Sequence, residues 1–397
     1  MKIFVIGEYY PPLRKWFAEG GAPEGVPAVY NFYTFLSKHP EHQFHARIYT
    51  QDLERKWTLE NGSSIELIRL NIPIYLLWKF CVYCIWWFKG GKHIRTYKPD
   101  IIYAQGSFVS IGARWGKRLG LPSVGRIFGT ILTDLVKRRK YFQLYTRNIL
   151  EVIGIKKPCD LVICTKDGTA YDEVARFFNP EIKVTLLYNG MEKKVRDQVL
   201  SYPVTKELSS NQPIYIASIA RLFYYKRHHL SIDLCKQLRA KGLDVRLTIV
   251  GSGPELANLK NEAQPIAEFV HFLPEMSQYE MLDWLKTQDV CTFYYAGGSL
   301  GNVLWECAMA GKLILTVDNG KTSDVIRHKE NGILHLDNEE LVEETVKSIE
   351  EYLDQDIEPI TNRLRADIKA IIPEWEIRFE KEMKLIEERF FPTRKSD

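Results

Sequence analysis

The segment RLTIVGSGPELANL (residues 246–259) joins an apolar, β-branched run to a helical pattern through a short turn that contains Gly251 and Gly253. This order predicts a buried β-strand that turns directly into a helix, which is the repeating unit of a doubly wound α/β domain. A glycine turn of this kind can bring backbone N–H groups close to a phosphate or a ribose. Because Leu256 stands where a dinucleotide fingerprint has its third glycine, a plain turn between strand and helix is the alternative.

The same alternation of strand and helix patterns runs through most of the chain and falls into two sets. The predicted strands of the first set are residues 2–7, 44–50, 65–70, 100–104, 122–128 and 160–165, and those of the second set are 214–220, 245–251, 268–273, 289–295 and 312–318. A polar stretch bracketed by prolines, residues 199–213, separates the sets. We therefore expect two Rossmann-like domains, residues 1–200 and 201–372, with a ligand cleft between the carboxyl ends of their sheets. Beyond these, residues 373–397 predict an amphipathic helix that has apolar side chains to bury.

Length, composition and charge narrow the class of protein. A chain of 397 residues with 45% hydrophobic and 26% charged residues is typical of packed globular domains. Residues 1–200 hold 30 Lys and Arg against 18 Asp and Glu, a net charge of +12, whereas residues 201–397 have a net charge of −8. The first half is therefore expected to contact an anionic partner, such as a membrane surface, a nucleic acid or a phosphorylated substrate. The chain begins with a strand-like run that lacks a cleavage-site pattern, which predicts a cytoplasmic protein, and its seven cysteines fit reduced structural thiols.

Two cations follow the first predicted strand of the second domain. Arg221 stands at the end of this strand, and Lys226 comes five residues later, just before an amphipathic helix. Positive donors at a strand end that faces a cleft can neutralise the charge that builds up on a departing diphosphate. The neighbouring Arg227, His228 and His229 are better explained as a solvated basic patch.

A third candidate element is the glycine-rich loop 296–301 and the helix predicted to begin near Asn302. The first turn of a helix has backbone N–H groups without helical partners at the positive end of the helix dipole, so it can hold an anion. Glu306 lies about one turn inside this helix, where its carboxylate could accept hydrogen bonds from the two hydroxyls of a ribose. An exposed helix glutamate is the alternative, but the neighbouring residues are apolar nearly all round the helix.

Taken in order, these segments resemble the C-terminal domain of the retaining GT-B glycosyltransferases of family four. The motifs that carry the resemblance are RLFYYK (221–226), IVGSGPEL (249–256), VHFLPEMSQYEMLDWL (270–285), GSLGNVLWECAMAGK (298–312) and DNGKTSDVIRHKENG (318–332). In the first half, MKIFVIGEYYPP, KPDIIYAQG, CDLVICTKDGT and VTLLYNGME also occur in the order of that family. The resemblance covers about residues 1–340. It implies a GT-B fold, in which two Rossmann-like domains face a cleft and a C-terminal helix crosses back to the first domain.

The resemblance also implies roles for individual residues. Arg221 and Lys226 would be the catalytic residues that bind the donor diphosphate, and Glu306 would bind the ribose. The donor-binding set by position is Glu306, Gly298, Ser299, Leu300, Gly301, Asn302, Gly20, Gly21, Gly25, Gly251 and Pro274, and the acceptor-side or sugar-side set is Phe128, Gly129 and Thr130. Residues 272–274 would lie against the nucleobase. No cofactor and no metal are expected, because these enzymes use a nucleotide sugar without a metal ion.

The sequence departs from the family pattern at three places. Gly298 stands where many members have a glutamate that touches the transferred sugar, and Phe128 stands where many have a histidine before Gly129. The small residue before the diphosphate-binding arginine, usually glycine, is Ala220. The first two departures leave the identity of the sugar unreadable from the sequence.

The activity that the resemblance implies is that of a retaining, metal-independent hexosyltransferase, which moves a hexose from a UDP- or GDP-linked sugar to a hydroxyl of a glycan or lipid-linked acceptor. In front-face transfer, the acceptor hydroxyl enters on the side that the nucleotide leaves, so the protein supplies positioning and charge stabilisation rather than a nucleophile. The string Asp354-Gln355-Asp356 could suggest a metal-dependent transferase of another fold, but it lies in a polar helix end and fits a solvated face.

Two basic and aromatic stretches, residues 72–95 and 135–147, bear on the acceptor. The apolar run within the first stretch is about fifteen residues, roughly 22 Å as a helix, which is shorter than a hydrocarbon core of ~30 Å. Tryptophans with a cationic flank are typical of a helix in a membrane interface, whereas packing of residues 74–88 on the first sheet is the alternative. The positive charge of the first half favours peripheral contact with the inner face of the cytoplasmic membrane and a lipid-linked or membrane-borne acceptor.

Other functions of the same fold stay open at this point. They are a glycosyltransferase directed at DNA or a small molecule, a nucleotide-sugar epimerase, and a non-catalytic member, the last made conceivable by Gly298. The joint presence of Arg221, Lys226 and Glu306 argues against the non-catalytic member. A nucleic-acid partner is not the favoured interpretation.

Overall fold

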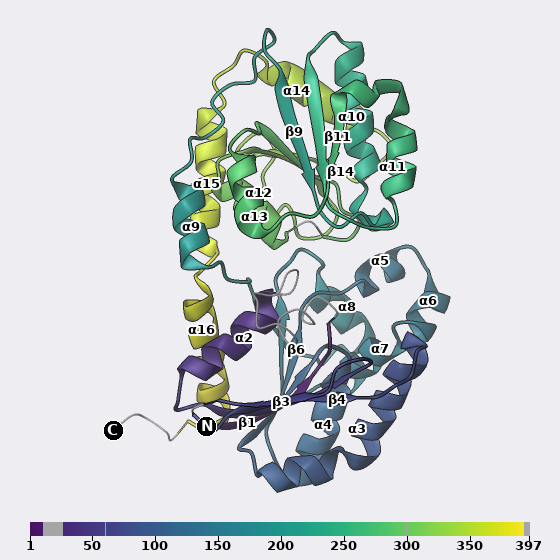
Figure 1. Ribbon diagram of the computed structural model, residues 1–397, viewed down its shortest axis with the longest axis vertical. Coiled ribbons are helices and arrows are strands. Elements are labelled where there is room, and N and C mark those ends of the chain that lie inside the picture. The colour runs from purple at the N-terminus through teal and green to yellow at the C-terminus, as the bar shows by residue number, and fades with distance from the viewer. Residues whose placement is uncertain (11–26, 60, 299, 393–397) are drawn as a thin grey trace. The chain divides into compact units, whose positions relative to one another are not determined.

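The computed structural model describes residues 1–10, 27–59, 61–298 and 300–392. The chain divides into two compact units, drawn in Figure 1. Unit 1 comprises Met1–Lys166, Tyr171–Gly190 and Trp375–Asp397, and unit 2 comprises Asp167–Ala170 and Met191–Glu374. Each unit has a mainly parallel sheet with helices between its strands, which confirms the predicted α/β class with two Rossmann-like domains.

Unit 1 is built on an eight-stranded sheet with the order β3-β4-β2-β1-β5-β6-β7-β8. Its strands are β1 (Lys2–Gly7), β2 (Gln43–Thr50), β3 (Arg55–Thr58), β4 (Ser64–Arg69), β5 (Ile101–Gln105), β6 (Ser123–Ile127), β7 (Leu161–Thr165) and β8 (Val184–Leu187). Neighbouring strands are parallel except β3 and β4, which pair antiparallel. The structure confirms the six predicted strands and adds β3 and β8, two four-residue strands at the edges of the sheet.

Helices cover both faces of this sheet. They are α2 (Pro27–Lys38), α3 (Tyr75–Tyr97), η1 (Gly106–Phe108), α4 (Val109–Leu119), α5 (Leu132–Lys137), α6 (Tyr141–Thr146), α7 (Ile149–Lys156), α8 (Tyr171–Phe178) and α16 (Trp375–Phe390). Side chains of β1 alternate between the faces because successive residues of a strand point to opposite sides. Ile3 and Val5 pack in one core cluster with α2, and Phe4 and Ile6 pack in another with α3 and α4.

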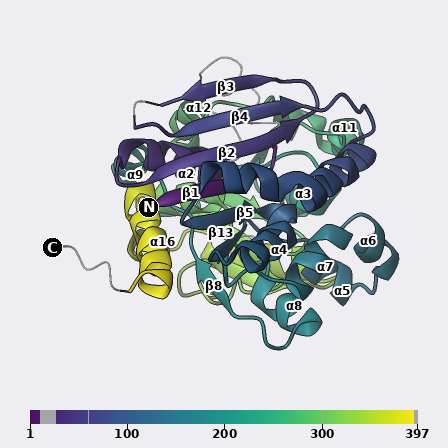
Figure 2. The same cartoon turned by 90° about the horizontal axis from the view of Figure 1, so that it is seen from below.

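The last helix, α16, completes the core of unit 1, as the family resemblance implied. Figures 1 and 2 show this yellow helix beside α2 and the N-terminal strand β1. Its buried side chains Trp375, Phe379, Met383 and Ile386 belong to the same core cluster as α2. The ring of Phe379 lies 5.7 Å from the ring of Phe32 and 5.7 Å from that of Phe35.

A buried ionic network also holds α16 in place. Glu382 has no exposed surface, accepts a hydrogen bond of 2.5 Å from the hydroxyl of Tyr103, and lies 2.5 Å from Nη1 of Arg378. Nε of Arg126, on β6, lies 3.8 Å from the same carboxylate, and Nε of Arg378 donates to the carbonyl of Tyr188 at 2.9 Å. Although burial alone would raise the pKa of Glu382, the two guanidinium groups hold it below its ordinary value. The carboxylate therefore balances two buried cations.

Unit 2 contains a six-stranded parallel sheet with the order β11-β10-β9-β12-β13-β14. Its strands are β9 (Ile214–Ile219), β10 (Val245–Val250), β11 (Val270–Leu273), β12 (Val290–Phe293), β13 (Leu313–Asp318) and β14 (Ile333–Leu336). Its helices are α9 (Lys193–Leu200), η2 (Tyr224–Lys226), α10 (His228–Ala240), α11 (Leu256–Ala263), η3 (Gln264–Phe269), α12 (Gln278–Leu285), α13 (Asn302–Met309), α14 (Leu341–Tyr352) and α15 (Glu358–Ile371). The five predicted strands are confirmed, and the edge strand β14 is an addition.

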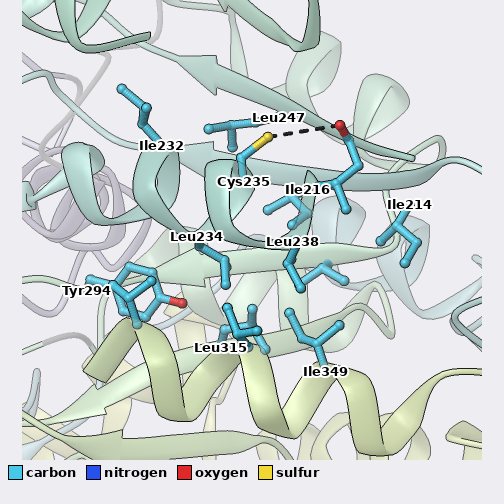
Figure 3. Close-up of a cluster of buried hydrophobic side chains, with 14 of the residues drawn as sticks. Ile214, Ile216, Ile232, Leu234, Cys235, Leu238, Leu247, Tyr294, Leu315 and Ile349 are labelled. Atoms are coloured by element: carbon cyan, nitrogen blue, oxygen red, sulfur yellow. Dashed lines mark hydrogen bonds between the residues drawn. The ribbon is translucent and has the colours of Figure 1, made fainter. Parts of the chain in front are cut away.

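The core of unit 2 lies between the sheet, α10 and α14. Figure 3 shows Leu234, Cys235 and Leu238 of α10 packed with Leu315 of β13 and Ile349 of α14. All five side chains are completely buried. This packing fixes the sheet and therefore the loops at its carboxyl edge.

The division of the chain differs from the predicted boundary between residues 200 and 201. Helix α9 belongs to unit 2, where Val195 and Val199 are buried and Arg196 donates to the carbonyl of Lys369 at 2.8 Å. Residues 167–170 also group with unit 2, and the return to unit 1 begins at Trp375 rather than at residue 373. The polar linker marks a break in the strand pattern, but it does not reveal which core the helix before it enters.

Two further expectations concern membranes and cysteines. Within the described ranges, no helix combines the length and the hydropathy needed to cross a bilayer. All seven cysteines are free thiols, with Cys81 and Cys84 partly exposed and the other five buried. The cysteines therefore agree with the prediction of reduced structural residues.

We predict that Glu382→Gln lowers the free energy of unfolding by about 3–5 kcal/mol, because it leaves two buried guanidinium groups without a counter-charge. The destabilisation is expected above pH 5 and should shrink in acid, where the wild-type carboxyl also becomes protonated. Chemical denaturation followed by circular dichroism measures it.

The matched control is Glu388→Gln on the same helix, since the side chain of Glu388 is 63% exposed. Equal effects of the two substitutions would show that the buried network does not hold α16.

Candidate functional site

The sheet of unit 2 changes its winding direction between β9 and β12. From β9 the strand order continues outward through β10 and β11, and from β12 it continues the other way through β13 and β14. In an open parallel sheet, ligands bind beside the carboxyl ends of the strands at this switch point. Arg221 and Lys226 follow β9, and Tyr295 and the glycine loop follow β12, so the predicted elements meet there.

Lys226 is held at the switch point by contacts to both neighbouring loops. Its backbone N–H donates to the carbonyl of Phe223 at 2.8 Å, and the N–H of Ala296 donates to the carbonyl of Tyr225 at 2.8 Å. The Lys226 Nζ atom lies 3.4 Å from the centre of the Tyr295 ring. A cation over the face of an aromatic ring is attracted by the ring quadrupole, so Tyr295 positions the ammonium group.

The electrostatic setting of Lys226 is unusual for a lysine. Burial, with a further contribution from the positive charge of Arg221, lowers its pKa to about 7, and Asp167 opposes the shift. The side chain therefore loses its proton readily while no anion is bound. An anionic ligand at this place would favour the ammonium form.

Arg221 lies beside Lys226 and is exposed to solvent. Its Nη2 atom donates to the hydroxyl of Tyr225 at 3.2 Å, and its guanidinium carbon lies 5.4 Å from the centre of the Phe223 ring. Two cations of the predicted diphosphate site thus stand next to each other on a frame of aromatic side chains.

Of the three basic residues that the sequence assigned to a solvated patch, Arg227, His228 and His229, the structure removes His228 from the surface. His228 is buried, its Nδ1 atom lies 2.8 Å from the hydroxyl of Ser218, and burial lowers its pKa to about 4. The guanidinium group of Arg227 donates to Asp337 at 2.6 Å. For His228 this prediction was wrong, because α10 begins at that residue and turns its side chain into the core of unit 2.

Gly251 and Gly253 have a structural reason for being glycine. Both have positive φ angles, and a Cβ atom on Gly251 would lie 2.1 Å from the carbonyl oxygen of Ala220. The loop after β10 therefore packs directly on the loop after β9, and the N–H of Leu222 donates to the carbonyl of Ser252 at 2.8 Å. Pro274 follows β11 at the same edge and is exposed. A contact of Gly251 or Pro274 with the donor stays a prediction.

The loop after β12 is more constrained than its composition suggests. Gly298 has a φ of 110°, and a Cβ atom there would lie 2.8 Å from the amide nitrogen of Thr169. The N–H of Gly298 donates to Oδ1 of Asn319 at 3.1 Å, and the N–H of Leu300 donates to the carbonyl of Asp167 at 3.2 Å. These two amides already have acceptors within the protein. A role of this loop as a cradle for the diphosphate stays a prediction.

Helix α13 begins directly after this loop. Gly301 is its N-cap and has no side chain that could satisfy the first backbone N–H groups. The positive end of the helix dipole therefore faces the carboxyl edge of the sheet. Asn302, Val303 and Leu304 supply the amides of the first turn.

Glu306 is buried in α13, at 5% exposure, and has a partner that the sequence analysis did not name. Its Oε1 atom accepts a hydrogen bond of 2.6 Å from Nε2 of Gln278, the first residue of α12. Burial raises the pKa of Glu306 to about 7, the bond from Gln278 opposes the shift, and the charge of Glu192 adds to it. Gln278 lies in the quoted motif 270–285, but only the fold reveals that it meets Glu306.

The acceptor-side or sugar-side residues lie in unit 1, after β6. The ring of Phe128 is 6.0 Å from that of Tyr10, and the guanidinium carbon of Arg126 is 4.6 Å from its centre. Gly129 has a φ of 134°, and the hydroxyl of Thr130 donates to Glu151. The three residues therefore stand at the carboxyl edge of the sheet of unit 1.

Some predicted residues and properties lack a structural test. Gly20, Gly21, Gly25 and Ser299 lie outside the described residues. Among the residues that are described, no group of three His, Cys, Asp or Glu side chains is placed to hold a metal ion. Metal independence stays a prediction.

Two doubly wound domains, the second with cations at its switch point, define the GT-B class of glycosyltransferase folds. Solved structures of this class have folds similar to that of this chain. Sucrose-phosphate synthase from Thermosynechococcus elongatus has a TM-score of 0.72 at 14% identity and covers 99% of this chain and 100% of its own. HepE from Anabaena, in complex with UDP and glucose, has a TM-score of 0.65 at 16% identity, with 97% and 99% covered. WaaG, a glycosyltransferase involved in lipopolysaccharide biosynthesis, has a TM-score of 0.64 at 15% identity, with 97% and 99% covered.

Residues 204–371 match the family Glycosyl transferases group 1. The matched residues lie within unit 2 and include the site described above. A curated relative, an uncharacterized glycosyltransferase from Haemophilus influenzae, is 32% identical over 148 residues. This match covers 34% of the chain and 38% of the relative.

We predict that Glu306→Gln stabilises the protein without ligand above pH 7. The folded-state pKa of about 7 lies above the ordinary value of 4.5, so the native state loses stability as pH rises from 4.5 through 7 and a neutral amide avoids this loss. The gain should reach about 2–3 kcal/mol at pH 8 and vanish near pH 4.5, as measured by urea denaturation across pH.

Glu339→Gln is the control, because Glu339 is exposed in the same unit. A Glu306→Gln protein that is no more stable than wild type at pH 8 would contradict the buried, destabilising carboxylate.

Proposed function

We propose that this chain is a retaining glycosyltransferase that moves a hexose from a nucleotide sugar to a hydroxyl of a glycan or lipid-linked acceptor. The observation that carries the proposal is the meeting of Arg221, Lys226 and the N-terminus of α13 at the switch point of unit 2. The family of residues 204–371 supports it. UDP is the favoured nucleotide, because HepE, which has a similar fold, forms complexes with UDP and UDP-glucose.

The proposed roles follow from charge and burial. Arg221 and Lys226 bind the diphosphate, whose negative charge grows as the bond to the sugar breaks. Lys226 enters the reaction with a pKa near 7, and the diphosphate itself keeps this group protonated. The backbone N–H groups of the first turn of α13 add hydrogen-bond donors that are already in position. Glu306 accepts hydrogen bonds from the ribose hydroxyls in place of its bond from Gln278.

In this proposal the acceptor hydroxyl attacks from the face that the nucleotide leaves, and a phosphate oxygen of the leaving diphosphate takes its proton. The chain therefore supplies positioning and positive charge rather than a nucleophile. Two side-chain cations and a helix N-terminus neutralise the charge that a metal ion neutralises in other transferases, so we propose a metal-independent reaction.

The sugar must be recognised differently from the usual family pattern. A side chain at position 298 would meet the backbone of Gly168 and Thr169 within 3 Å, so a glutamate does not fit there in this structure. Other groups then hold the hexose, and the proposal leaves its identity open.

We place the enzyme at the inner face of the cytoplasmic membrane because of exposed side chains on unit 1. Trp78, Val82, Tyr83 and Trp86 of α3 are buried, so the inner part of this helix packs on the sheet. The start of α3 instead presents the exposed Ile74, Tyr75, Leu76, Leu77 and Phe80, and α6 presents Tyr141, Phe142 and Tyr145. Figures 1 and 2 draw α3 and α6 on the same side of unit 1.

The positive charge next to α6 supports the same membrane-binding surface. Lys137, Arg138, Arg139 and Lys140 are all exposed and directly precede α6. Aromatic and apolar side chains next to a basic run bind the interface of an anionic bilayer through burial and electrostatic attraction together. The proposal therefore combines the two interpretations of residues 72–95. Trp78 and Trp86 of α3 pack in the core, whereas Leu76, Leu77 and Phe80 are exposed and form part of the proposed membrane surface.

We predict that UDP raises the melting temperature of the wild-type protein in a panel of UDP, GDP and ADP. Arg221→Ala and Lys226→Ala should each abolish this shift and lower the rate constant for transfer by ~10²-fold or more, because a diphosphate loses one of two cations. Thermal shift and release of UDP from UDP-sugars are the measurements.

Lys347→Ala, an exposed lysine on α14, controls for the loss of a positive charge. Near-normal turnover in either site variant, with a normal fold, would contradict the role of Arg221 and Lys226 in binding the diphosphate.

We predict that the protein sediments with vesicles containing phosphatidylglycerol at low salt and that Phe142→Asp and Leu76→Asp each lower the bound fraction severalfold. Both side chains are more than half exposed on the proposed membrane surface. Co-sedimentation quantifies the effect.

Ile377→Asp is the matched control, since Ile377 is 54% exposed on α16, which Figure 2 shows at the opposite end of unit 1 from α6. No sedimentation of the wild type would contradict membrane contact. Salt-dependent binding to DNA in its place would favour a DNA-directed transferase.

A further inference from the structure

One short segment from the first half of the chain belongs to unit 2. Residues Asp167–Ala170 follow β7, yet they group with Met191–Glu374, whereas the residues on either side of them belong to unit 1. Gly168 has a φ of 83°, which a glycine adopts without strain. The segment is therefore a loop of unit 2 that comes from outside the continuous part of that unit.

This loop packs against the glycine loop that follows β12. The N–H of Leu300 donates to the carbonyl of Asp167 at 3.2 Å. A Cβ atom on Gly298 would lie 2.8 Å from the amide nitrogen of Thr169 and 2.9 Å from the carbonyl carbon of Gly168. The backbone of residues 168 and 169 thus occupies the space that a side chain at position 298 would need.

The carboxylate of Asp167 has a defined orientation within the loop. Its Oδ1 atom accepts hydrogen bonds from the backbone N–H of Thr169 at 3.0 Å and from the hydroxyl of Thr169 at 2.6 Å. Asp167 is partly exposed. Because a carboxylate can accept about four hydrogen bonds, Thr169 can hold this group while it also accepts bonds from a ligand.

The same carboxylate lies within electrostatic reach of Lys226. Burial and the charge of Arg221 lower the pKa of Lys226, and the charge of Asp167 opposes them. The backbone of Asp167 is bonded to Leu300, which directly precedes Gly301, the N-cap of α13. Asp167 therefore stands next to two of the elements that we assign to the diphosphate.

A negative charge at this place does not help to bind a diphosphate. Like charges repel, so the carboxylate of Asp167 opposes the anion that Lys226 attracts. In a nucleotide sugar, however, the hexose is bonded directly to the terminal phosphate, so it must also lie close to Lys226. Sugar hydroxyls are hydrogen-bond donors, and bonds that they make to an ionised carboxylate are stronger than bonds to a neutral acceptor.

We propose that Asp167 binds one or more hydroxyls of the transferred hexose and thereby determines which nucleotide sugar the enzyme accepts. The proposal rests on the proposed glycosyltransferase function and deepens it by assigning recognition of the sugar to the loop after β7. This loop fills the place beside Gly298 where many members of the family have a glutamate. A carboxylate from a different segment of the chain would then supply the missing acceptor.

The alternative role of Asp167 is to act only through Lys226, as a counter-charge that keeps the ammonium group protonated. In that role Asp167 changes the affinity for every ligand that carries the diphosphate by a similar factor. Binding of a particular hydroxyl changes the affinity only for donors that have this hydroxyl. The two roles therefore predict different results with modified donors.

The test measures the affinities of the full chain for UDP, UDP-glucose, UDP-galactose and UDP-N-acetylglucosamine by calorimetry. We expect Asp167→Asn to lower the affinity for the preferred UDP-hexose by about fivefold or more relative to the affinity for UDP, because a hydrogen bond to a charged acceptor is lost. Asparagine keeps the size of the side chain and an oxygen that can accept from Thr169. Near-ultraviolet circular dichroism checks that the variant keeps its fold.

Deoxy forms of the preferred donor, each lacking one hydroxyl of the hexose, identify the contact. One of them should bind the wild type about fivefold more weakly than the parent donor, and Asp167→Asn should cause no further loss with that one. With the other deoxy donors, the substitution should lower the affinity as it does with the parent.

Asp283→Asn is the matched control, because the side chain of Asp283 is 65% exposed on α12 of the same unit, and it should leave all affinities unchanged. Thr169→Val keeps the carboxylate but removes a hydroxyl that orients it. This variant should show a smaller loss with the same pattern across the deoxy donors.

The proposal is overturned if Asp167→Asn changes the affinities for UDP and for the UDP-hexose by the same factor, or if it weakens every deoxy donor equally. A wild type that binds UDP but none of the UDP-hexoses would also contradict it. Failure of the wild type to bind UDP would instead remove the donor site of the proposed function, and this inference with it, so the two failures are distinguishable.

Discussion

Parallel pairing of strands is the constraint on which both units depend. It brings the carboxyl ends of all strands except β3 to one edge of each sheet, and the reversal of strand order opens one place on that edge where side chains from distant segments meet. In unit 2 this place holds two cations, and in unit 1 it holds the carboxylate of Glu8, 3.1 Å from Nζ of Lys79. The same architecture thus presents different charges in the two halves of the chain.

Most of the fold could be predicted from the sequence because buried parallel strands are short, continuous apolar runs bounded by turns. All eleven predicted strands are present. The edge strands β3, β8 and β14 have only four residues each and lie partly exposed, so they lack the same signal. The boundary was misplaced because the amphipathic pattern of α9 shows that Val195 and Val199 must be buried, but not against which unit.

The candidate site could be predicted in part. Ordered motifs located Arg221, Lys226 and Glu306, and the structure brings the two cations together. Gln278 and Tyr295 were missed, since each acts through a contact between segments that are separate in the sequence, and the burial of His228 was missed because α10 begins at that residue and turns its side chain into the core. The first of these reasons also applies to Gly298, whose close neighbours at Gly168 and Thr169 come from the segment that follows β7.

Helix α16 has a consequence for the synthesis of the chain. The core of unit 1 contains Trp375, Phe379, Met383 and Ile386, which are synthesised after all of unit 2. Domains usually fold in the order in which they are made, but here unit 1 needs core side chains that are made after every strand of unit 2. Nascent unit 1 therefore exposes the apolar surface of α2 around Phe32 and Phe35 until α16 has been made.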